Sequence, residues 1–213
     1  MSTDPIAPPT KSTQVYRELR RDITTGQYAP GQNLVRRDML KKYAVSLSII
    51  NEALSRLMHD GLIERGERET ARVIQPDEQQ LQSDFMLREA VERQVARLLA
   101  EKADDEILRA LRRDAQALDR WIATEGPDST LHLEFHLKMA RATGYRSLET
   151  TLHRLGMRSL VVARWLRSQQ FFHPADFHEQ LVEAIQSRNA STADEAMRAH
   201  LHYDENFPPK AKG

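Results

Sequence analysis

The chain has 213 residues, no cysteine and a formal net charge of zero. This composition excludes a disulfide scaffold and thiol chemistry, and no apolar run is long enough for a membrane span or a secretion leader. We therefore expect a cytoplasmic protein of about two small domains with no membrane partner.

Charge is unevenly distributed along the chain: residues 11–75 carry 12 Lys/Arg and 8 Asp/Glu, whereas residues 76–207 carry 17 Lys/Arg and 22 Asp/Glu. The basic front part suits a phosphate-facing module, although solvated helix faces alone can also produce such an asymmetry.

The N-terminal third reads as three short helices. Residues 1–12 are rich in proline and polar residues, which predicts a disordered arm. Apolar spacing predicts helices over about 13–25, 36–43 and 46–60. Gly26 is placed to end the first of these helices, and Ser46 or Ser48 is placed to cap the third.

The third helix has one apolar and one polar face. Its apolar residues recur at i, i+3, i+4 and i+7, which predicts a buried stripe of Ile50, Ala53, Leu54 and Leu57. Leu47, Asn51 and Ser55 are then turned outward. Segments 62–65 and 71–74 favour a β-hairpin. Three helices and a hairpin predict a winged helix-turn-helix over residues 13–75, whose third helix enters the DNA major groove.

The rest of the chain has helical periodicity and few strand signals. Residues 76–207 are therefore predicted to form an antiparallel six-helix bundle, followed by a flexible tail at 208–213. The fold class is mainly α. Leu87, Val91, Val95 and Leu98 are expected in the bundle core. The expected helices span residues 77–103, 105–124, 129–142, 145–168, 174–188 and 191–206.

Four histidines in this part have a spacing that suits a metal ion. His132 and His136 lie four residues apart, on one helix face, and His178 and His200 follow. Imidazole ligands suit Zn, Ni, Co or Cu better than Mg or Ca, so zinc or nickel is the expected ion. The alternative is that each histidine is a surface residue. His59 and His202 are predicted to be exposed in any case, while the roles of His153 and His173 stay open.

Several motifs together resemble the GntR family of bacterial transcription factors, in the FadR-like subfamily with a C-terminal FCD ligand domain. The resemblance runs from about Thr13 to Phe207. In the first part it is carried by Ile23 with Gly26, Pro30-Gly31 with Leu34, Val45-Ser46, and the run from Glu52 to Ile63. In the second part it is carried by Phe135-His136, by His178 through Ile185, and by Ala196-Met197 with His200-Leu201.

The resemblance implies a DNA-reading surface, but this chain departs from the family pattern there. The usual arginines after Val-Ser are replaced by the run from Leu47 to Asn51, and the wing glycine by Thr70. Asn suits adenine and an apolar side chain suits the thymine methyl, so we expect an operator rich in A·T. The alternative is a weakened module that needs the N-terminal arm. The candidate DNA-binding residues are Arg37, Ser46, Leu47, Ser48, Asn51, Arg65 and Arg68.

The resemblance also implies a metal site and an effector. His136, His178 and His200 match the family's histidines, and His132 stands where the family usually has an aspartate. Four neutral imidazoles leave the ion's double charge uncompensated, which favours an anionic effector such as a small organic acid. Its carboxylate could be held by an arginine, with a surface salt bridge as the alternative role. The candidates are Arg88, Arg158 and Arg164, while Trp121 and Trp165 are expected in the core or an interface.

These features predict a homodimeric regulator rather than an enzyme. Two winged helices would read a palindromic operator, and a small organic acid bound at the metal would release a repressor. Two alternatives use the same histidines: a metal-dependent enzyme, in which the ion activates water, and a metal sensor, in which the ion itself is the signal.

Overall fold

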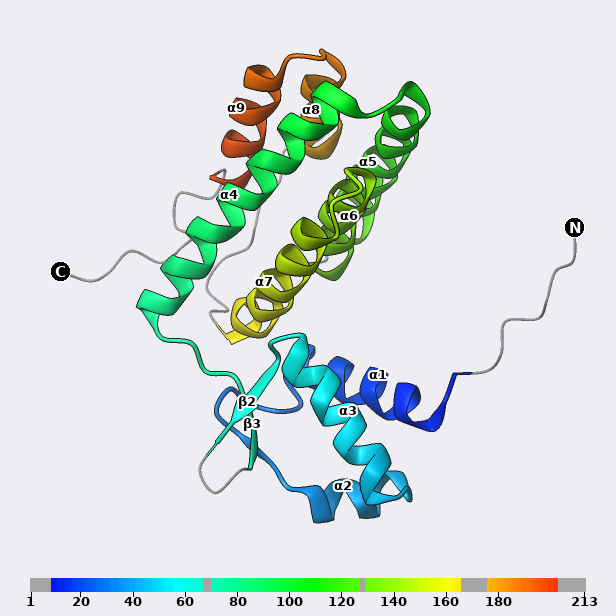
Figure 1. Ribbon diagram of the computed structural model, residues 1–213, viewed down its shortest axis with the longest axis vertical. Helices are drawn as coiled ribbons and strands as arrows, with labels where there is room; N and C mark the ends of the chain where they lie inside the picture. Colours follow the sequence, from blue (N-terminus) through cyan, green and yellow to red (C-terminus); the bar gives the residue numbers. More distant parts are fainter. Residues whose placement is uncertain (1–8, 67–69, 127–128, 166–175, 203–213) are drawn as a thin grey trace, which may run out of the picture. The chain divides into compact units, whose positions relative to one another are not determined.

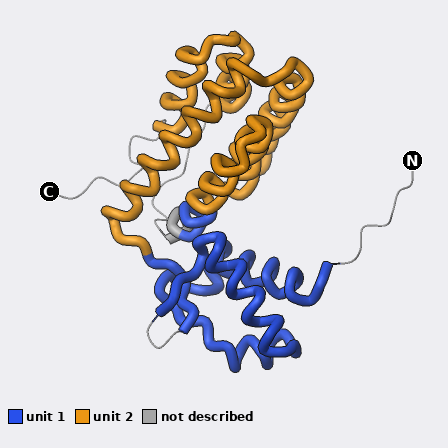
Figure 2. Tube along the Cα trace, in the orientation of Figure 1, with its two compact units in different colours: residues 1–75, 157–166 blue, residues 76–156, 167–213 orange. Residues whose placement is uncertain are grey.

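The computed structural model describes residues 9–66, 70–126, 129–165 and 176–202, with the backbone alone for residues 162–165. The predicted tail and most of the predicted arm fall outside these ranges. The chain divides into two compact units, residues 1–75 with 157–166 and residues 76–156 with 167–213 (Figure 2). Among the described residues, no helix is long and apolar enough to cross a membrane.

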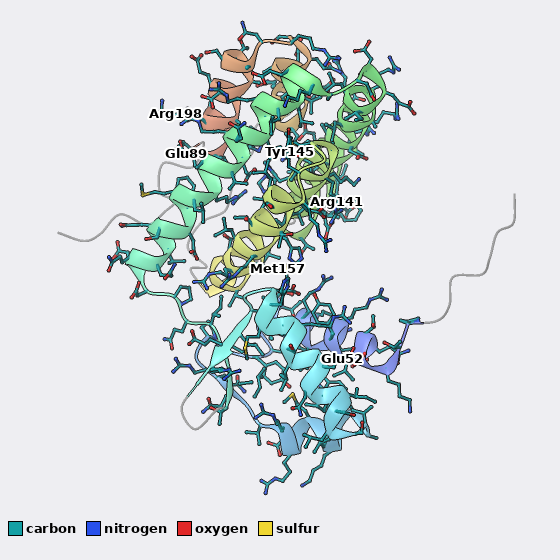
Figure 3. The ribbon with its side chains drawn as sticks, in the orientation of Figure 1. Glu52, Glu89, Arg141, Tyr145, Met157 and Arg198 are labelled. Atoms are coloured by element: carbon teal, nitrogen blue, oxygen red, sulfur yellow. The ribbon has the colours of Figure 1, made fainter. Side chains whose placement is uncertain are left out.

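The first unit contains the three predicted helices, α1 (Lys11–Thr24), α2 (Arg36–Tyr43) and α3 (Leu47–His59). α1 and α2 both pack against α3. The predicted stripe of α3 is buried, because it supplies the side chains that these two helices cover. The α1–α3 interface also includes a polar contact in which Ser12 Oγ donates to Glu52 Oε1 at 2.8 Å; Glu52 is labelled in Figure 3.

A three-stranded sheet completes this unit, with strands β1 (Asn33–Leu34), β2 (Ile63–Arg65) and β3 (Ala71–Val73) in the order β1-β3-β2. Both pairings are antiparallel, and Ile63 faces Val73 across the hairpin. The hairpin confirms the predicted wing, whereas β1 was not predicted, since two residues are too few to show an alternation. Three helices and this sheet form a winged helix-turn-helix (Figure 1).

The positions of this unit with left-handed backbone include Gly26 and Ala44. Gly26 has φ 78° and follows the end of α1, as predicted. Ala44, between α2 and α3, has φ 50°. A left-handed residue other than glycine costs about 1–2 kcal/mol. The turn between the two helices is therefore held in place by the packing around it and not by the preference of Ala44.

The second unit is helical throughout its described residues. It contains α4 (Glu78–Lys102), α5 (Asp105–Glu125), α6 (Ser129–Ala142), α8 (Phe177–Gln186) and α9 (Ala190–Leu201). The sixth helix, α7 (Arg146–Trp165), begins in this unit, and its residues from 157 onward are grouped with the first unit. α4 packs along α9, α5 packs along α8, and α6 contacts both α4 and α5 (Figure 1). These six helices confirm the predicted mainly α architecture.

The helix ends differ from the predictions by a few residues. α1 begins two residues early because Thr10 caps it, its side chain accepting a hydrogen bond from the backbone N–H of Thr13. Asp77 and Asp104 cap α4 and α5 in the same way. The predicted extensions of α7 beyond residue 165 and of α9 beyond residue 202 lie outside the described residues.

The predicted apolar stripe of α4 is only partly correct. Val91 and Val95 are buried, whereas Leu87 is 49% exposed. The prediction for Leu87 as a core residue was wrong, because an apolar residue on a helix is buried only where another part of the fold packs against it. A buried position on α4 that the apolar pattern did not show is taken by Glu92, which is 1% exposed.

Candidate metal centre and DNA-reading surface

The four predicted histidines meet in the second unit. α6 supplies His132 and His136, α8 supplies His178 at its first turn, and α9 supplies His200 near its end. One nitrogen from each ring lies within 4.8 Å of the corresponding nitrogen of the others. Three helices that are separate in sequence therefore bring their imidazoles to one point.

The spacing of the ring nitrogens fits a bound ion. The Nε2 atom of His136 lies 2.9 Å from Nε2 of His132 and 3.1 Å from Nε2 of His200, and the last two are 3.5 Å apart. Imidazole nitrogens that bind one zinc ion at about 2.0–2.1 Å lie about 3.3 Å apart in a tetrahedron and about 2.9 Å apart in an octahedron. The observed separations cover this range, so the rings of His132, His136 and His200 are already close to a coordinating arrangement.

Burial favours the neutral, metal-binding form of two of these rings, His132 and His178. His136, His178 and His200 are buried, and His132 is half-buried. Burial lowers the pKa of His132 well below its ordinary value of 6.5, and the neighbouring imidazoles lower it further. Burial also lowers the pKa of His178, against the opposing effect of Asp119. Neutral imidazoles whose nitrogens face one another repel through their lone pairs, and a metal cation at their centre removes that repulsion.

Glu92 of α4 supports one of the rings. Its Oε2 contacts Nδ1 of His136, and Oε1 accepts a hydrogen bond of 2.5 Å from Nε of Arg88. Burial alone would raise the pKa of Glu92, but Arg88 and His136 outweigh it and lower this pKa to about 2. The ionised carboxylate places the proton of His136 on Nδ1, which leaves Nε2 to face the cluster.

Asp119 of α5 supports a second ring. Its Oδ1 accepts a hydrogen bond of 2.5 Å from Nδ1 of His178. Oδ2 also accepts hydrogen bonds of 3.0 Å from the backbone N–H groups of His178 and Glu179, at the start of α8. Burial raises the pKa of Asp119, yet its hydrogen bonds produce a net lowering. One carboxylate therefore orients a ligand and caps the helix that carries it.

These carboxylates change the charge expected at the site. The prediction of an uncompensated double charge considered the four imidazoles alone. A divalent ion next to Glu92, Asp119 and Arg88 has two negative charges and one further positive charge beside it. The group then keeps one net positive charge, so an anion is still favoured, but less strongly than the imidazoles alone imply.

The three arginines predicted to hold an effector have different surroundings. Arg88 lies beside the cluster with its side chain 15% exposed and bonded to Glu92. Arg158 is half-buried on α7. The side chain of Arg164 lies outside the described residues, as does that of Trp165. Trp121 is 46% exposed and so does not lie in the core of its unit.

The other histidines lie outside the cluster. His59 is exposed, as predicted. His202 is also exposed, and its Nε2 contacts Oε2 of Glu89 at 2.9 Å. Glu89 is labelled on α4 in Figure 3, and Arg198 on the neighbouring α9. His153 is half-buried on α7, and His173 falls outside the described residues.

The candidate DNA-reading residues lie at the surface of the first unit. At the start of α3, Leu47 is 49% exposed, and Ser46, Ser48 and Asn51 are exposed as well. Ser46 begins this helix without a capping bond from its side chain; its Oγ lies 2.9 Å from Oγ of Ser48 instead. Arg37 and Arg65 are exposed, and Arg68 lies outside the described residues.

Asn51 has a neighbour that the sequence did not indicate. Nε of Arg36 donates to Oδ1 of Asn51 at 3.1 Å, across the turn between α2 and α3. A planar guanidinium that binds the amide oxygen fixes the amide's orientation. Arg36 was missed because its link to Asn51 spans 15 residues. Glu92 could have been noticed as a charged residue beside Val91 on an apolar face, whereas no sequence signal marks Asp119.

Comparison with known proteins agrees with both units. Residues 11–73 match the family described as bacterial regulatory proteins, gntR family, and residues 85–203 match the FCD domain. The HTH-type transcriptional regulator YdhC of Bacillus subtilis (strain 168) is 23% identical over 198 residues, covering 90% of this chain and 88% of YdhC. The HTH-type transcriptional repressor GlaR of Escherichia coli (strain K12) is 26% identical over 87% of this chain and 90% of its own length. The repressor NanR of the same strain is 26% identical over 93% of this chain and 84% of NanR.

Solved structures show the same fold. Escherichia coli McbR/YncC has a TM-score of 0.71 at 17% identity, covering 93% of this chain and 96% of its own. A GntR transcriptional regulator from Rhodococcus sp. RHA1 has a TM-score of 0.71 at 20% identity, covering 92% and 96%. The match to the gntR family covers the helix-turn-helix unit. The match to the FCD domain lies in the helical part and alone covers more than half of the whole chain. The chain therefore belongs to the GntR family of bacterial transcriptional regulators, in the FadR-like subfamily whose C-terminal part is an FCD domain.

Proposed function

We propose that this regulator is a homodimeric repressor in the cytoplasm. In this proposal residues 13–75 bind DNA and residues 76–207 hold the metal and the effector. Two copies read the two halves of a palindromic operator, because one small winged helix has limited affinity by itself. The similarity to GlaR and NanR, both named repressors, supports the direction of control.

The observation that carries the metal part is the convergence of the four histidine nitrogens within 4.8 Å, with carboxylates behind two of the rings. His132, His136, His178 and His200 would hold zinc or nickel, since all four donors are imidazoles. When bound, the ion supplies a Lewis-acidic centre for a carboxylate. Glu92 and Asp119 hold the proton on the Nδ1 atoms, and this leaves the Nε2 atoms as ligands.

The proposed effector is a small organic acid that binds at an open coordination position. The net positive charge of the loaded site favours an anion, and Arg88 is bonded to Glu92, which contacts His136. Arg158 and Arg164 are the other candidates. Release from DNA requires that the acid bind the released state more tightly than the DNA-bound state.

The proposed operator is rich in A·T where the start of α3 meets the bases. Leu47 offers an apolar contact for thymine methyl groups, and Asn51, oriented by Arg36, offers the amide that suits adenine. Arg37, Ser46, Ser48, Arg65 and Arg68 would add backbone contacts that position the module.

The experiment that tests this proposal is a genome-wide footprint with purified protein, in metal-free and zinc-loaded forms, with and without candidate carboxylic acids. The expected result is sharp palindromic sites that one acid weakens only when metal is present. An absence of specific sites in every condition would show that the winged helix no longer reads sequence.

A metal sensor is the second candidate, and the fourth histidine favours it. Four imidazoles are enough to fill a tetrahedral shell, in which case no position stays open for an acid. DNA binding that responds to zinc alone, with no effect of any acid, would select this alternative. Membership of a family of transcriptional regulators sets aside the metal-dependent enzyme.

A further inference from the structure

A chain of buried side chains runs from Arg88 to the histidine cluster. Nε of Arg88 donates to Oε1 of Glu92 at 2.5 Å, and the other carboxylate oxygen contacts Nδ1 of His136. The side chain of Arg88 is 15% exposed, that of Glu92 is 1% exposed and that of His136 is fully buried. Glu92 therefore divides one negative charge between a guanidinium and a proposed metal ligand.

We propose that Arg88 weakens metal binding at the histidine cluster by neutralising Glu92, and that an anion paired with Arg88 strengthens it. The inference rests on the proposed metal centre and concerns the regulation of that site. Arg88 then acts on the metal as a positioning residue, through Glu92 and His136.

The two supporting carboxylates show why Arg88 matters. An ionised carboxylate behind an imidazole makes the opposite ring nitrogen a stronger ligand, and its charge also attracts the cation. Asp119 gives this support through bonds to one ring and to backbone N–H groups, which carry no full charge. Glu92 gives the same support to His136, but it is also bonded to the positively charged Arg88. The positive charge of Arg88 is also felt at His132, whose pKa it helps to lower.

An anion at Arg88 has donors to bind. Among the described residues, the bonded partner of this guanidinium is Glu92, through Nε, and the terminal nitrogens have no other hydrogen bond there. A carboxylate that pairs with these nitrogens would offset the charge of Arg88. Glu92 would then act more fully on His136, so that anion and metal would each raise the affinity for the other.

Three possible roles for Arg88 predict three different changes in zinc affinity when Arg88 is removed. If Arg88 attenuates metal binding, its removal tightens the binding of zinc added alone. If Arg88 mainly holds Glu92 in place and ionised, its removal weakens zinc binding, as removal of Glu92 does. If it only grips an effector, its removal leaves the zinc affinity unchanged when no effector is present.

The test measures zinc affinity of the full chain by competition with a fluorescent chelator, for the wild type, Arg88→Gln, Arg88→Lys and Glu92→Gln. The expected tightening for Arg88→Gln is about 3- to 10-fold, from the loss of one nearby positive charge. Glu92→Gln is expected to weaken binding about 10- to 100-fold. Arg88→Lys keeps the charge and should stay within about 2-fold of the wild type, as should Arg97→Gln, a matched charge loss at an exposed position of α4.

The anion is tested with sodium acetate against sodium chloride at constant ionic strength. Acetate should tighten zinc binding in the wild type, and this gain should shrink in Arg88→Gln. Unchanged or weaker zinc binding by Arg88→Gln would overturn the attenuating role, and an equal acetate effect in both proteins would overturn the anion link. Circular dichroism checks that the variants fold. If the wild type binds no zinc, the proposed metal centre itself fails, which is a separate result.

Discussion

The histidine cluster and the DNA-reading end of α3 are built in opposite ways. The cluster is buried, and its ligands are held from behind by Glu92 and Asp119. The start of α3 is exposed, and among its reading residues Asn51 has a side-chain contact from Arg36. A buried site depends on the packing of several helices, whereas an exposed surface can change residue by residue without loss of the fold. This difference explains how the surface at the start of α3 can depart from the pattern that the family resemblance implies while the four histidines still meet at one point.

The largest loss of zinc affinity is expected when His136, a residue of the buried cluster, is substituted. His136→Gln removes the ligand whose Nε2 is within 3.1 Å of two other ring nitrogens, so zinc affinity should fall by more than about 100-fold, beyond the usual effect of a supporting residue. Zinc should raise the melting temperature of the wild type but not of this variant, because only the wild type binds it when folded. His202→Gln, a change at an exposed histidine outside the cluster, serves as the control. Equal zinc protection of both variants would contradict the cluster as the binding site.

A smaller loss of zinc affinity is expected when Asp119, which supports His178 from behind the cluster, is substituted. Asp119→Asn keeps an oxygen for the backbone N–H groups of α8 but loses the charge behind His178, so zinc affinity should fall about 10- to 100-fold. The matched control is Asp114→Asn on the same helix, where the carboxylate pairs with Lys138 at the surface. Competition with a chelator measures both. An equal small change in the two variants would show that Asp119 acts only in folding.

On the exposed surface, the expected effect depends on the DNA sequence. Asn51→Ala should cost about 1–3 kcal/mol of discrimination at the adenine position of a selected operator. Binding is measured by fluorescence anisotropy on operators with adenine and with guanine at that position. His59→Ala, at the exposed far end of α3, should leave this discrimination intact.

Arg36→Ala tests whether Arg36 contributes to the same discrimination by orienting Asn51. If Arg36 orients Asn51, its removal should reduce discrimination at the adenine position in the same direction as Asn51→Ala. A phosphate contact would instead weaken binding to all sequences and lower the salt dependence. The second result would mean that the orienting contact has no effect in the complex.

The smallest effect concerns an ion pair at the edge of the helical unit. The Arg93 side chain donates to Asp194 at 2.5 Å and lowers the pKa of Asp194 below its ordinary value of 3.8. A lowered carboxyl pKa gives stability that is present above the unfolded pKa and is lost as the pH falls through the folded pKa. Asp194→Asn should therefore lower the melting temperature by a few degrees at pH 7, and this difference should shrink as the pH falls below 3.8 and through the lowered pKa of Asp194.

The control for this pair is Asp105→Asn, because the Asp105 side chain is 76% exposed and its pairing with Arg188 is screened by water. Its effect on the melting temperature at pH 7 should be smaller than that of Asp194→Asn. Differences of equal size, or a difference for Asp194→Asn that persists unchanged at low pH, would contradict a stabilising Arg93–Asp194 pair.

Periodicity and spacing in the sequence determined the main features of the fold. The stripe from Ile50 to Leu57 identified α3 and its outward residues, because a 3.6-residue repeat reports directly which face is buried. The i, i+4 spacing of His132 and His136 is enough to place two rings on one face of a helix. The family resemblance then pointed to His178 and His200.

Only the tertiary structure decided which residues stand behind these rings and how much of each helix is covered. The link from Asp119 to His178 spans 59 residues, and that from Glu92 to His136 joins two helices, so no local pattern contains either of them. Leu87 has the same apolar character as Val91, yet it is exposed, because burial depends on whether another helix lies against that turn. Local sequence determines a helix and its apolar face, while long-range packing determines what that face meets.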